Sequence, residues 1–244
     1  MKRFDILTLF PEIVLPPLGE SIVGRAQEKG LLQIRVVNFR NYAKDRHHIV
    51  DDFPFGGGPG MVLKPEPIFA AVRDCVGDPS GGRVILMSPA GRRFDQEVAK
   101  ALASEEHLVF ICGRYKGVDE RVRETLVTDE ISIGDYVLSG GELPALVVIE
   151  AVARLIPGVL GDEDSARGDS FYEGILDHPH YTRPSVFEGR EVPPVLISGH
   201  HEQIRRWRRK EALRRTRRRR PDLLCKGLTE EDEALLGEVE REES

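Results

Sequence analysis

The sequence predicts an α/β protein with a mostly parallel sheet, followed by a small helical C-terminal domain. First, apolar segments rich in branched residues alternate with segments of helical periodicity over two thirds of the chain. Second, a small, polar and acidic stretch replaces this alternation near Pro157. Third, basic residues gather in one block of the last third. We expect a large domain over 1–160, a flexible linker over 161–170 and a helical domain over 171–244.

Five short segments are typical of buried strands, because they are apolar without polar alternation, as expected where helices cover both faces of a sheet. In chain order they are RFDILTLF (3–10), LQIRVVNF (32–39), RVILMS (83–88), HLVFIC (107–112) and EISI (130–133). Helical periodicity, in one case after starting prolines, is found over 12–28, 65–75, 95–103 and 143–156. The alternation predicts that the strands run parallel.

Length and composition exclude several classes of protein. With 244 residues and 40% hydrophobic content, the chain can bury a sizeable core. The N-terminal apolar run is short and lacks a cleavage site, and no stretch of about twenty apolar residues occurs, so we expect a cytoplasmic protein without membrane spans. Cys75, Cys112 and Cys225 lie far apart without CxxC spacing, and we expect buried, reduced thiols.

The net charge of −6 conceals a basic block between Arg205 and Arg220. This block holds ten arginines and one lysine against a single glutamate, a local charge of +10 that leaves −16 for the rest of the chain. At this density we expect most guanidinium groups to lack a nearby carboxylate. The block therefore favours a polyanionic partner, with nucleic acid as the leading candidate, over a solvated helix face.

Three glycine-containing segments each follow a predicted strand directly. They are SPAGRRFD (88–95), CGRYKGVDERV (112–122) and SIGDYVLSGGELP (132–144). Ligands collect beyond the carboxyl ends of parallel strands, so we expect these loops to converge on one site. Neither GxGxxG nor GxxxxGK[ST] occurs, which favours a ligand held by backbone groups over one held by a phosphate loop. Tight turns are the alternative explanation for any single glycine.

Five long motifs resemble, in the same order, the bacterial tRNA (guanine-N1)-methyltransferase (TrmD) family of the SPOUT class. They are HHIVDDFPFGGGPGM (47–61), CGRYKGVDERV, SIGDYVLSGGELPALVVIEAVARLIPGVLG, GDSFYEGILDHPHYTRP (168–184) and EVPPVLISGHHEQIRRWR (191–208). The resemblance implies an S-adenosyl-L-methionine site in a deep trefoil knot of the sheet domain. It implies methyl transfer to N1 of the guanine at tRNA position 37, next to the anticodon. It also implies a homodimer that binds the tRNA anticodon stem-loop.

The resemblance further assigns residues to the site. Those that would bind S-adenosyl-L-methionine are Ser88, Pro89, Gly113, Tyr115, Ile133, Gly134, Asp135, Tyr136, Val137, Leu138, Gly140 and Gly141. Asp169 aligns with the base that takes the N1 proton, and Arg154 with the residue that stabilises negative charge at O6. The chain departs from the family pattern at Lys116 and Gly168, where acidic residues are common, and at Ile131, where an aromatic residue is common.

The sequence predicts no metal site on the protein. The histidine pairs at 47/48, 178/180 and 200/201 occur without HExxH and without a nearby cysteine, so roles in turns or facing RNA are favoured. The family is associated with magnesium dependence, but no segment resembles a magnesium cage, so we expect any Mg²⁺ to accompany RNA or substrate. Two other functions stay open: a SPOUT ribose 2′-O-methyltransferase and a non-catalytic RNA-binding protein.

Overall fold

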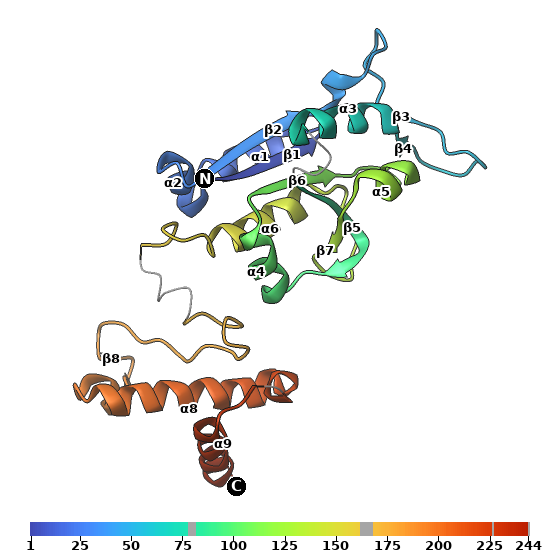
Figure 1. Cartoon of the computed structure of the whole chain (residues 1–244). Helices are drawn as coiled ribbons and strands as arrows, with labels where there is room; N and C mark the ends of the chain where they lie inside the picture. The colour runs from blue at the N-terminus through green and yellow to red at the C-terminus, as the bar shows by residue number, and fades with distance from the viewer. Residues whose placement is uncertain (78–81, 162–167, 226, 244) are drawn as a thin grey trace. The chain divides into compact units, whose positions relative to one another are not determined.

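A computed structural model describes residues 1–77, 82–161, 168–225 and 227–243. The chain divides into two compact units, Met1–Gly161 and Asp162–Ser244, and each has a hydrophobic core of its own (Figure 1). Most of the predicted linker falls on residues 162–167, which lie outside the described residues. Within the described ranges, no helix has both the length and the hydrophobicity that a membrane span requires.

The first unit is built on a five-stranded parallel sheet (Figure 1), which confirms the predicted fold class. In spatial order its strands are β2 (Leu32–Asn38), β1 (Lys2–Thr8), β6 (His107–Cys112), β5 (Arg83–Arg93) and β7 (Asp129–Ser132). Strand β1 lies inside the sheet, where Phe4 pairs with Ile34 on one side and with Leu108 on the other. Because all five strands are parallel, their carboxyl ends lie at one edge.

Helices cover both faces of this sheet, which explains why the central parts of its strands are mostly apolar. Leu108 and Phe110 of β6 point into one core, whereas Val109 and Ile111 point into the other. The first core is covered by α1 (Pro11–Leu18), α2 (Ser21–Glu28), α4 (Gln96–Ser104) and α6 (Glu142–Ala153). The second is covered by η1 (Phe39–Tyr42), α3 (Pro65–Val76) and α5 (Glu120–Leu126). The sheet is thus the middle layer of three.

Most predicted elements shift by a few residues at their ends, and two differ more substantially from the structure. The single helix expected over 12–28 is two helices, because Pro16 and Pro17 cannot donate backbone hydrogen bonds and α1 ends directly after them. Strand β5 extends past the predicted end at residue 88. Its register against β7 shifts between Met87 and Arg92, and the residues beyond the shift resume pairing with β7. The extended part of β5 therefore runs alongside the end of β7.

Helix α5 and the short strands β3 (Asp51–Asp52) and β4 (Val62–Leu63) are absent from the sequence prediction. Helix α5 is short, and the Asp119 side chain caps it by accepting a hydrogen bond from the backbone N–H of Arg121. The loop between β3 and β4 projects from the unit and exposes Phe53 and Phe55 (Figure 1). Two large apolar side chains on a projecting loop mark a surface that a partner can cover.

The cysteines agree with the prediction at two of three positions. Cys75 and Cys112 are buried, and burial raises the pKa of the Cys75 thiol to about 11 and that of Cys112 well above its usual value. These two thiols are therefore neutral and unreactive near pH 7. The prediction is wrong for Cys225, which is exposed at the end of η3 (Pro221–Cys225), a turn without any buried residue.

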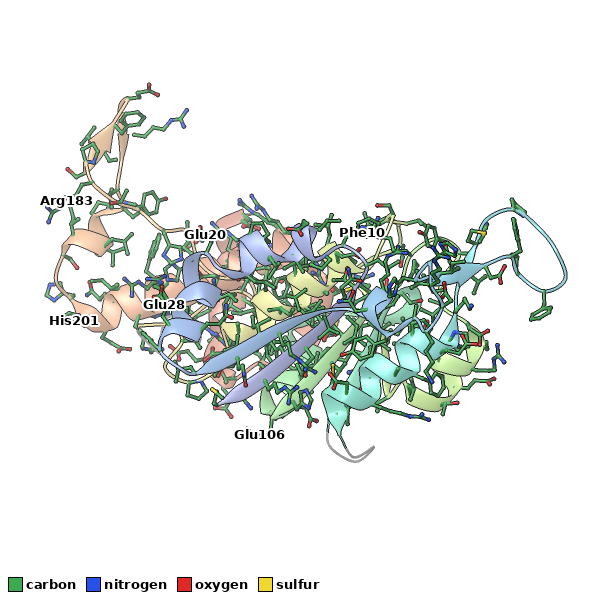
Figure 2. The ribbon with its side chains drawn as sticks, turned by 90° about the horizontal axis from the view of Figure 1, so that it is seen from above. Phe10, Glu20, Glu28, Glu106, Arg183 and His201 are labelled. Carbon is green, nitrogen blue, oxygen red and sulfur yellow. The ribbon has the colours of Figure 1, made fainter. Side chains whose placement is uncertain are left out.

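The second unit is mostly helical, as its composition predicts. Its elements are β8 (Val186–Phe187), β9 (Arg190–Glu191), η2 (Pro194–Ile197), α8 (His201–Arg219), η3 and α9 (Glu230–Glu243). Its small core gathers Ile175, Ala212, Leu213 and Leu235. The β8–β9 hairpin was not expected. Figure 2 shows Arg183 where the chain enters this hairpin and His201 at the start of α8.

Candidate functional site

The irregular part of β5 at its register shift and the loops that follow β6 and β7 surround a cavity of about 660 Å³ at the carboxyl edge of the sheet. This volume is within the range of small-molecule sites, roughly 300–1,000 Å³. Eleven of the twelve positions predicted to bind cofactor line it, namely Ser88, Pro89, Gly113, Tyr115, Ile133, Gly134, Tyr136, Val137, Leu138, Gly140 and Gly141. Asp135 is the exception and is not among the lining residues. The three segments thus meet in one place, as their positions after predicted parallel strands indicate.

Some lining residues were missed by sequence reasoning. They include Ala90, Lys116, Gly117, Ser132, Ser139 and Pro144. All of them lie inside the three glycine-containing segments, so the sequence indicated the right segments but not these individual residues. Within an irregular loop, however, no periodicity tells which side chains face inward.

Glycines at this edge allow backbone to touch backbone. The N–H of Gly141 donates to the carbonyl oxygen of Gly113 at 2.9 Å, and a Cβ at position 141 would lie 2.7 Å from Cα of Cys112. The φ of Gly141 is −82°, which any residue can adopt, so close packing and not backbone conformation requires glycine here. Gly91 is a similar case, since its Cβ would lie 2.4 Å from the backbone nitrogen of Ile131. The extended part of β5 packs on β7, and the loop after β7 packs on the end of β6, too closely for side chains at these points.

The loop after β7 is folded by its own hydrogen bonds. Gly134 has a φ of +151°, a conformation that favours glycine. Its carbonyl oxygen accepts hydrogen bonds from the Ser132 hydroxyl at 3.0 Å and from the N–H of Tyr136 at 2.9 Å. These contacts leave Tyr136, Val137 and Leu138 partly exposed along the cavity. An apolar wall of this kind suits a flat, largely apolar ligand group.

A buried charged cluster, also missed by sequence reasoning, supports this wall. The Glu142 carboxylate is almost fully buried; its Oε1 accepts from the Thr8 hydroxyl at 2.7 Å, and its Oε2 lies 3.1 Å from Nη2 of Arg114. The Arg114 guanidinium also stacks over the Phe10 ring, 4.3 Å from its centroid. A Cβ on Gly140 would lie 2.3 Å from Oε2 of Glu142. The cluster ties β1 and the loop after β6 to the start of α6.

The two predicted catalytic residues belong to different units. Arg154 directly follows α6, is half-buried, and donates its backbone N–H to the Glu150 carbonyl at 3.3 Å. Asp169 is exposed in the second unit, where its carbonyl accepts from the N–H of Tyr172 at 3.2 Å. Neither residue lines the 660 Å³ cavity. Asp169 lines a separate hollow of about 730 Å³ in the second unit.

The arginine block forms most of α8, and ion pairs to α9 neutralise much of it. These pairs are Arg205–Glu231, Arg206–Glu238, Arg209–Asp232, Lys210–Glu242, Arg214–Glu242, Arg217–Glu243 and Arg218–Glu243. The expectation that these cations lack nearby carboxylates is therefore wrong. The carboxylates come from the acidic end of the chain, which is distant in sequence but packs against α8. Most pairs are exposed, so solvent screens their charges and each adds little stability.

One pair in this interface is buried. Arg209 donates two hydrogen bonds to Asp232, at 2.7 and 2.9 Å, and Asp232 is 1% exposed. These bonds, with another from the Thr229 N–H, lower the pKa of Asp232 to about 2. Asp232 therefore stays ionised near neutral pH and holds α9 against α8 in a defined position.

Asp177, His178 and His180 form a side-chain cluster in the turn before the hairpin. One potential metal-ligand atom from each lies within 4.8 Å of the others. The Asp177 carboxylate is 2.6 Å from Nε2 of His180, and the two imidazole rings are 4.3 Å apart. Hydrogen bonding within the turn accounts for this grouping.

Comparisons with known proteins agree with this geometry. Residues 1–226 match the family described as tRNA (Guanine-1)-methyltransferase TrmD. The chain is 59% identical over 244 residues to a tRNA (guanine-N(1)-)-methyltransferase of Moorella thermoacetica, covering 99% of this chain and 98% of the relative. It is 55% identical over 242 residues to the protein of that name from Bacillus subtilis, covering 98% of this chain and 100% of the relative.

Proposed function

The chain belongs to the tRNA (guanine-N1)-methyltransferase family, and on this premise we propose how its own residues carry out the transfer. It is a methyltransferase that acts on N1 of guanine in tRNA. We propose that the target is the guanine at position 37, that S-adenosyl-L-methionine is the methyl donor, and that the enzyme acts in the cytoplasm. The observation that carries this proposal is the cavity where eleven predicted cofactor positions meet.

The cavity fits S-adenosyl-L-methionine in its size and in the chemistry of its walls. Backbone groups of the 113–115 and 133–141 segments would hold the adenine and ribose, beside the apolar side chains of Val137 and Leu138. Ser88 and Pro89 would form the opposite wall. The bound cofactor supplies an electrophilic methyl group on a sulfonium centre. We assign Mg²⁺ no site on the protein and place it with the RNA.

We infer that the loops around this cavity form the trefoil knot of the SPOUT class. Close backbone contacts support the inference, since Gly141 packs on Cys112 and Gly91 packs on Ile131. Chain segments that thread past one another require such contacts without intervening side chains. The bridge between Arg114 and Gly140 joins two of the segments involved.

The proposed chemistry uses one acid–base group and one cation of this chain. Guanine N1 carries a weakly acidic proton, which the Asp169 carboxylate would accept as N1 attacks the methyl group. The bond between that methyl group and the cofactor's sulfur would break, and the neutral thioether S-adenosylhomocysteine would leave. As this proton leaves, negative charge shifts toward O6, and the Arg154 guanidinium would donate hydrogen bonds there. Asp169 is exposed in the second unit, which is compatible with a group that acts only once RNA is bound.

We propose that the enzyme is a homodimer that buries an apolar surface of the first unit. Helix α6 is apolar except at Glu142, which is buried, and Glu150, which is exposed, and Leu143 and Val147 remain about half exposed on it. Helix α1 packs against α6 and also exposes Ile13 and Leu15. Phe10, which is labelled in Figure 2, directly precedes α1. We expect the partner to be a second copy of the chain, because a two-fold axis places the same apolar surface of each copy against that of the other.

The dimer can be tested by sedimentation velocity. The wild-type chain should sediment at twice its 27.4 kDa mass, and Leu143→Glu should shift it toward the monomer, because a charge at the interface cannot be desolvated without a partner. Val186→Glu is the matched control, since Val186 is exposed to a similar extent in the second unit. A wild-type protein that stays monomeric at micromolar concentration would contradict the proposal.

The activity can be tested with tRNA transcripts that carry guanosine or adenosine at position 37. We expect methyl transfer from labelled S-adenosyl-L-methionine to the guanosine transcript alone, with the label on N1 in digested nucleosides. Label on the ribose, in both transcripts, would favour the 2′-O-methyltransferase alternative. Absence of cofactor binding in calorimetry would favour a non-catalytic RNA-binding protein.

A further inference from the structure

The pairing of α8 with α9 leaves few of its cations for RNA. Among the described residues, Arg208, Arg215 and Arg219 are the arginines of α8 without an ion pair. Arg215 donates to the carbonyl oxygens of Asp177 and His178, at 3.0 and 3.3 Å, so it is held by the protein itself. A polyanion would thus meet Arg208 more readily than the paired arginines on either side of it.

Arg208 lines a hollow of about 390 Å³ in the second unit. The turn that contains His178, His180 and Tyr181 forms one wall, Arg183 lies at its edge, and Leu196 contributes an apolar part. Figure 2 shows Arg183 on the segment that leads into the hairpin. The hollow therefore combines cations, aromatic rings and a small apolar surface.

The rings of this hollow form a connected group with an exposed end. The Trp207 ring centroid lies 6.3 Å from that of Tyr181 and 6.5 Å from that of His178, while Trp207 itself is half-buried. Tyr181 is 50% exposed and His180 is exposed as well. Trp207 thus serves as a support, and Tyr181 and His180 offer free ring surface.

The turn is fixed before any ligand arrives. Arg215 holds its carbonyl oxygens, the Leu176 N–H donates to the Thr216 hydroxyl at 3.0 Å, and the Asp177 N–H donates to the Ser170 hydroxyl at 3.0 Å. Ring surfaces held in place in this way lose little entropy when a ligand stacks on them.

We propose that this hollow binds an unstacked nucleobase of a single-stranded RNA loop, in a step that rests on the proposed tRNA substrate. The base would stack on Tyr181, and Arg208 and Arg183 would contact the flanking phosphates. Single-stranded loops are recognised by such stacking on aromatic side chains, and phosphates by unpaired guanidinium groups. We thus place the RNA contact on one face of the second unit, whereas the sequence predicts it for the arginine block as a whole.

The test measures binding of the full-length chain to a labelled anticodon stem-loop and to an RNA duplex without a loop, at several salt concentrations. Tyr181→Ala should weaken stem-loop binding about tenfold and leave duplex binding unchanged, whereas Tyr181→Phe should bind like wild type. Arg208→Ala should weaken binding and reduce the slope of log affinity against log salt by about one. Arg206→Ala is the matched control, since Arg206 is paired with Glu238, and it should leave the slope unchanged.

Two outcomes would overturn the inference. One is stem-loop binding by Tyr181→Ala that equals wild type. The other is an equal loss in Arg206→Ala and Arg208→Ala, which would mean that RNA displaces α9 from the paired arginines. Cofactor binding by calorimetry should be unchanged in all variants. A wild-type chain that neither binds cofactor nor methylates would instead contradict the proposed function, so the two failures are distinguishable.

Discussion

Asp169→Asn is expected to bind S-adenosyl-L-methionine like the wild type and to lose methyl transfer by about 10²–10⁴-fold. The amide keeps the shape of the side chain but cannot accept the N1 proton. Asp169 is exposed in the second unit and is absent from the lining of the cofactor cavity, so cofactor affinity should not change. Single-turnover rates with saturating tRNA, beside calorimetric cofactor binding, measure the two effects separately.

The matched control is Glu173→Gln, an exposed carboxylate of the same segment that pairs with Arg209 at 3.0 Å. It should keep near wild-type rates, because its charge has no place in the reaction. If Asp169→Asn also keeps wild-type single-turnover rates, the assignment is wrong. The base would then be sought among His47, His48 and the carboxylates of the VDDF segment.

Arg154 should behave differently from Asp169, because its proposed task is to stabilise charge at O6. Arg154→Lys keeps the positive charge but loses the planar fork, so it should retain only part of the rate, and Arg154→Ala less. Equal rates for the two Arg154 variants would contradict a role for its charge.

Gly141→Val should abolish cofactor binding, with methylation lost as a result. A Cβ at this position would lie 2.7 Å from Cα of Cys112, 3.1 Å from the backbone nitrogen of Gly113 and 3.1 Å from Cβ of Met87. Two of these atoms are backbone, so no side-chain rotation relieves the clash, and the loops after β6 and β7 must separate. Calorimetry with S-adenosyl-L-methionine measures the effect.

Two further variants separate loss of the site from loss of the fold. Gly141→Ala adds only the clashing Cβ and should already weaken cofactor binding, with far-ultraviolet circular dichroism showing retained secondary structure. Gly161→Ala is the control, because a Cβ there meets nothing within 4 Å. Normal cofactor binding by a folded Gly141→Val protein would contradict the close packing of these loops and the knot proposed from it.

The sequence alone was sufficient for the parallel sheet. Strand β6 has the predicted bounds, because Leu108 to Cys112 alternate between two covered faces and every one of them is apolar. The convergence of the irregular part of β5 with the loops after β6 and β7 also followed from the sequence, since parallel strands place their carboxyl ends at one edge. A short stretch of sequence is enough to predict such a strand, because burial on both faces of a sheet requires a nearly continuous run of apolar residues.

Only the tertiary structure decided which contacts form between segments that are distant in sequence. The requirement for glycine at 141 comes from Cys112, and the buried Glu142 depends on Thr8 and Arg114. The spacing of residues within one segment cannot predict such contacts between segments. The roles of Asp169 and Arg154 came from family resemblance, because an exposed carboxylate and a helix-end arginine carry no local signal.

The arginine block shows this limit most clearly. Its sequence determined a helix of high positive charge, and the acidic end determined another helix of opposite charge. Only the packing of α9 on α8 decided which guanidinium groups are neutralised. Within the described ranges, Arg206 is paired and Arg208 has no ion pair. Pairing depends on which helix faces meet, and charges close in space can be far apart in the chain.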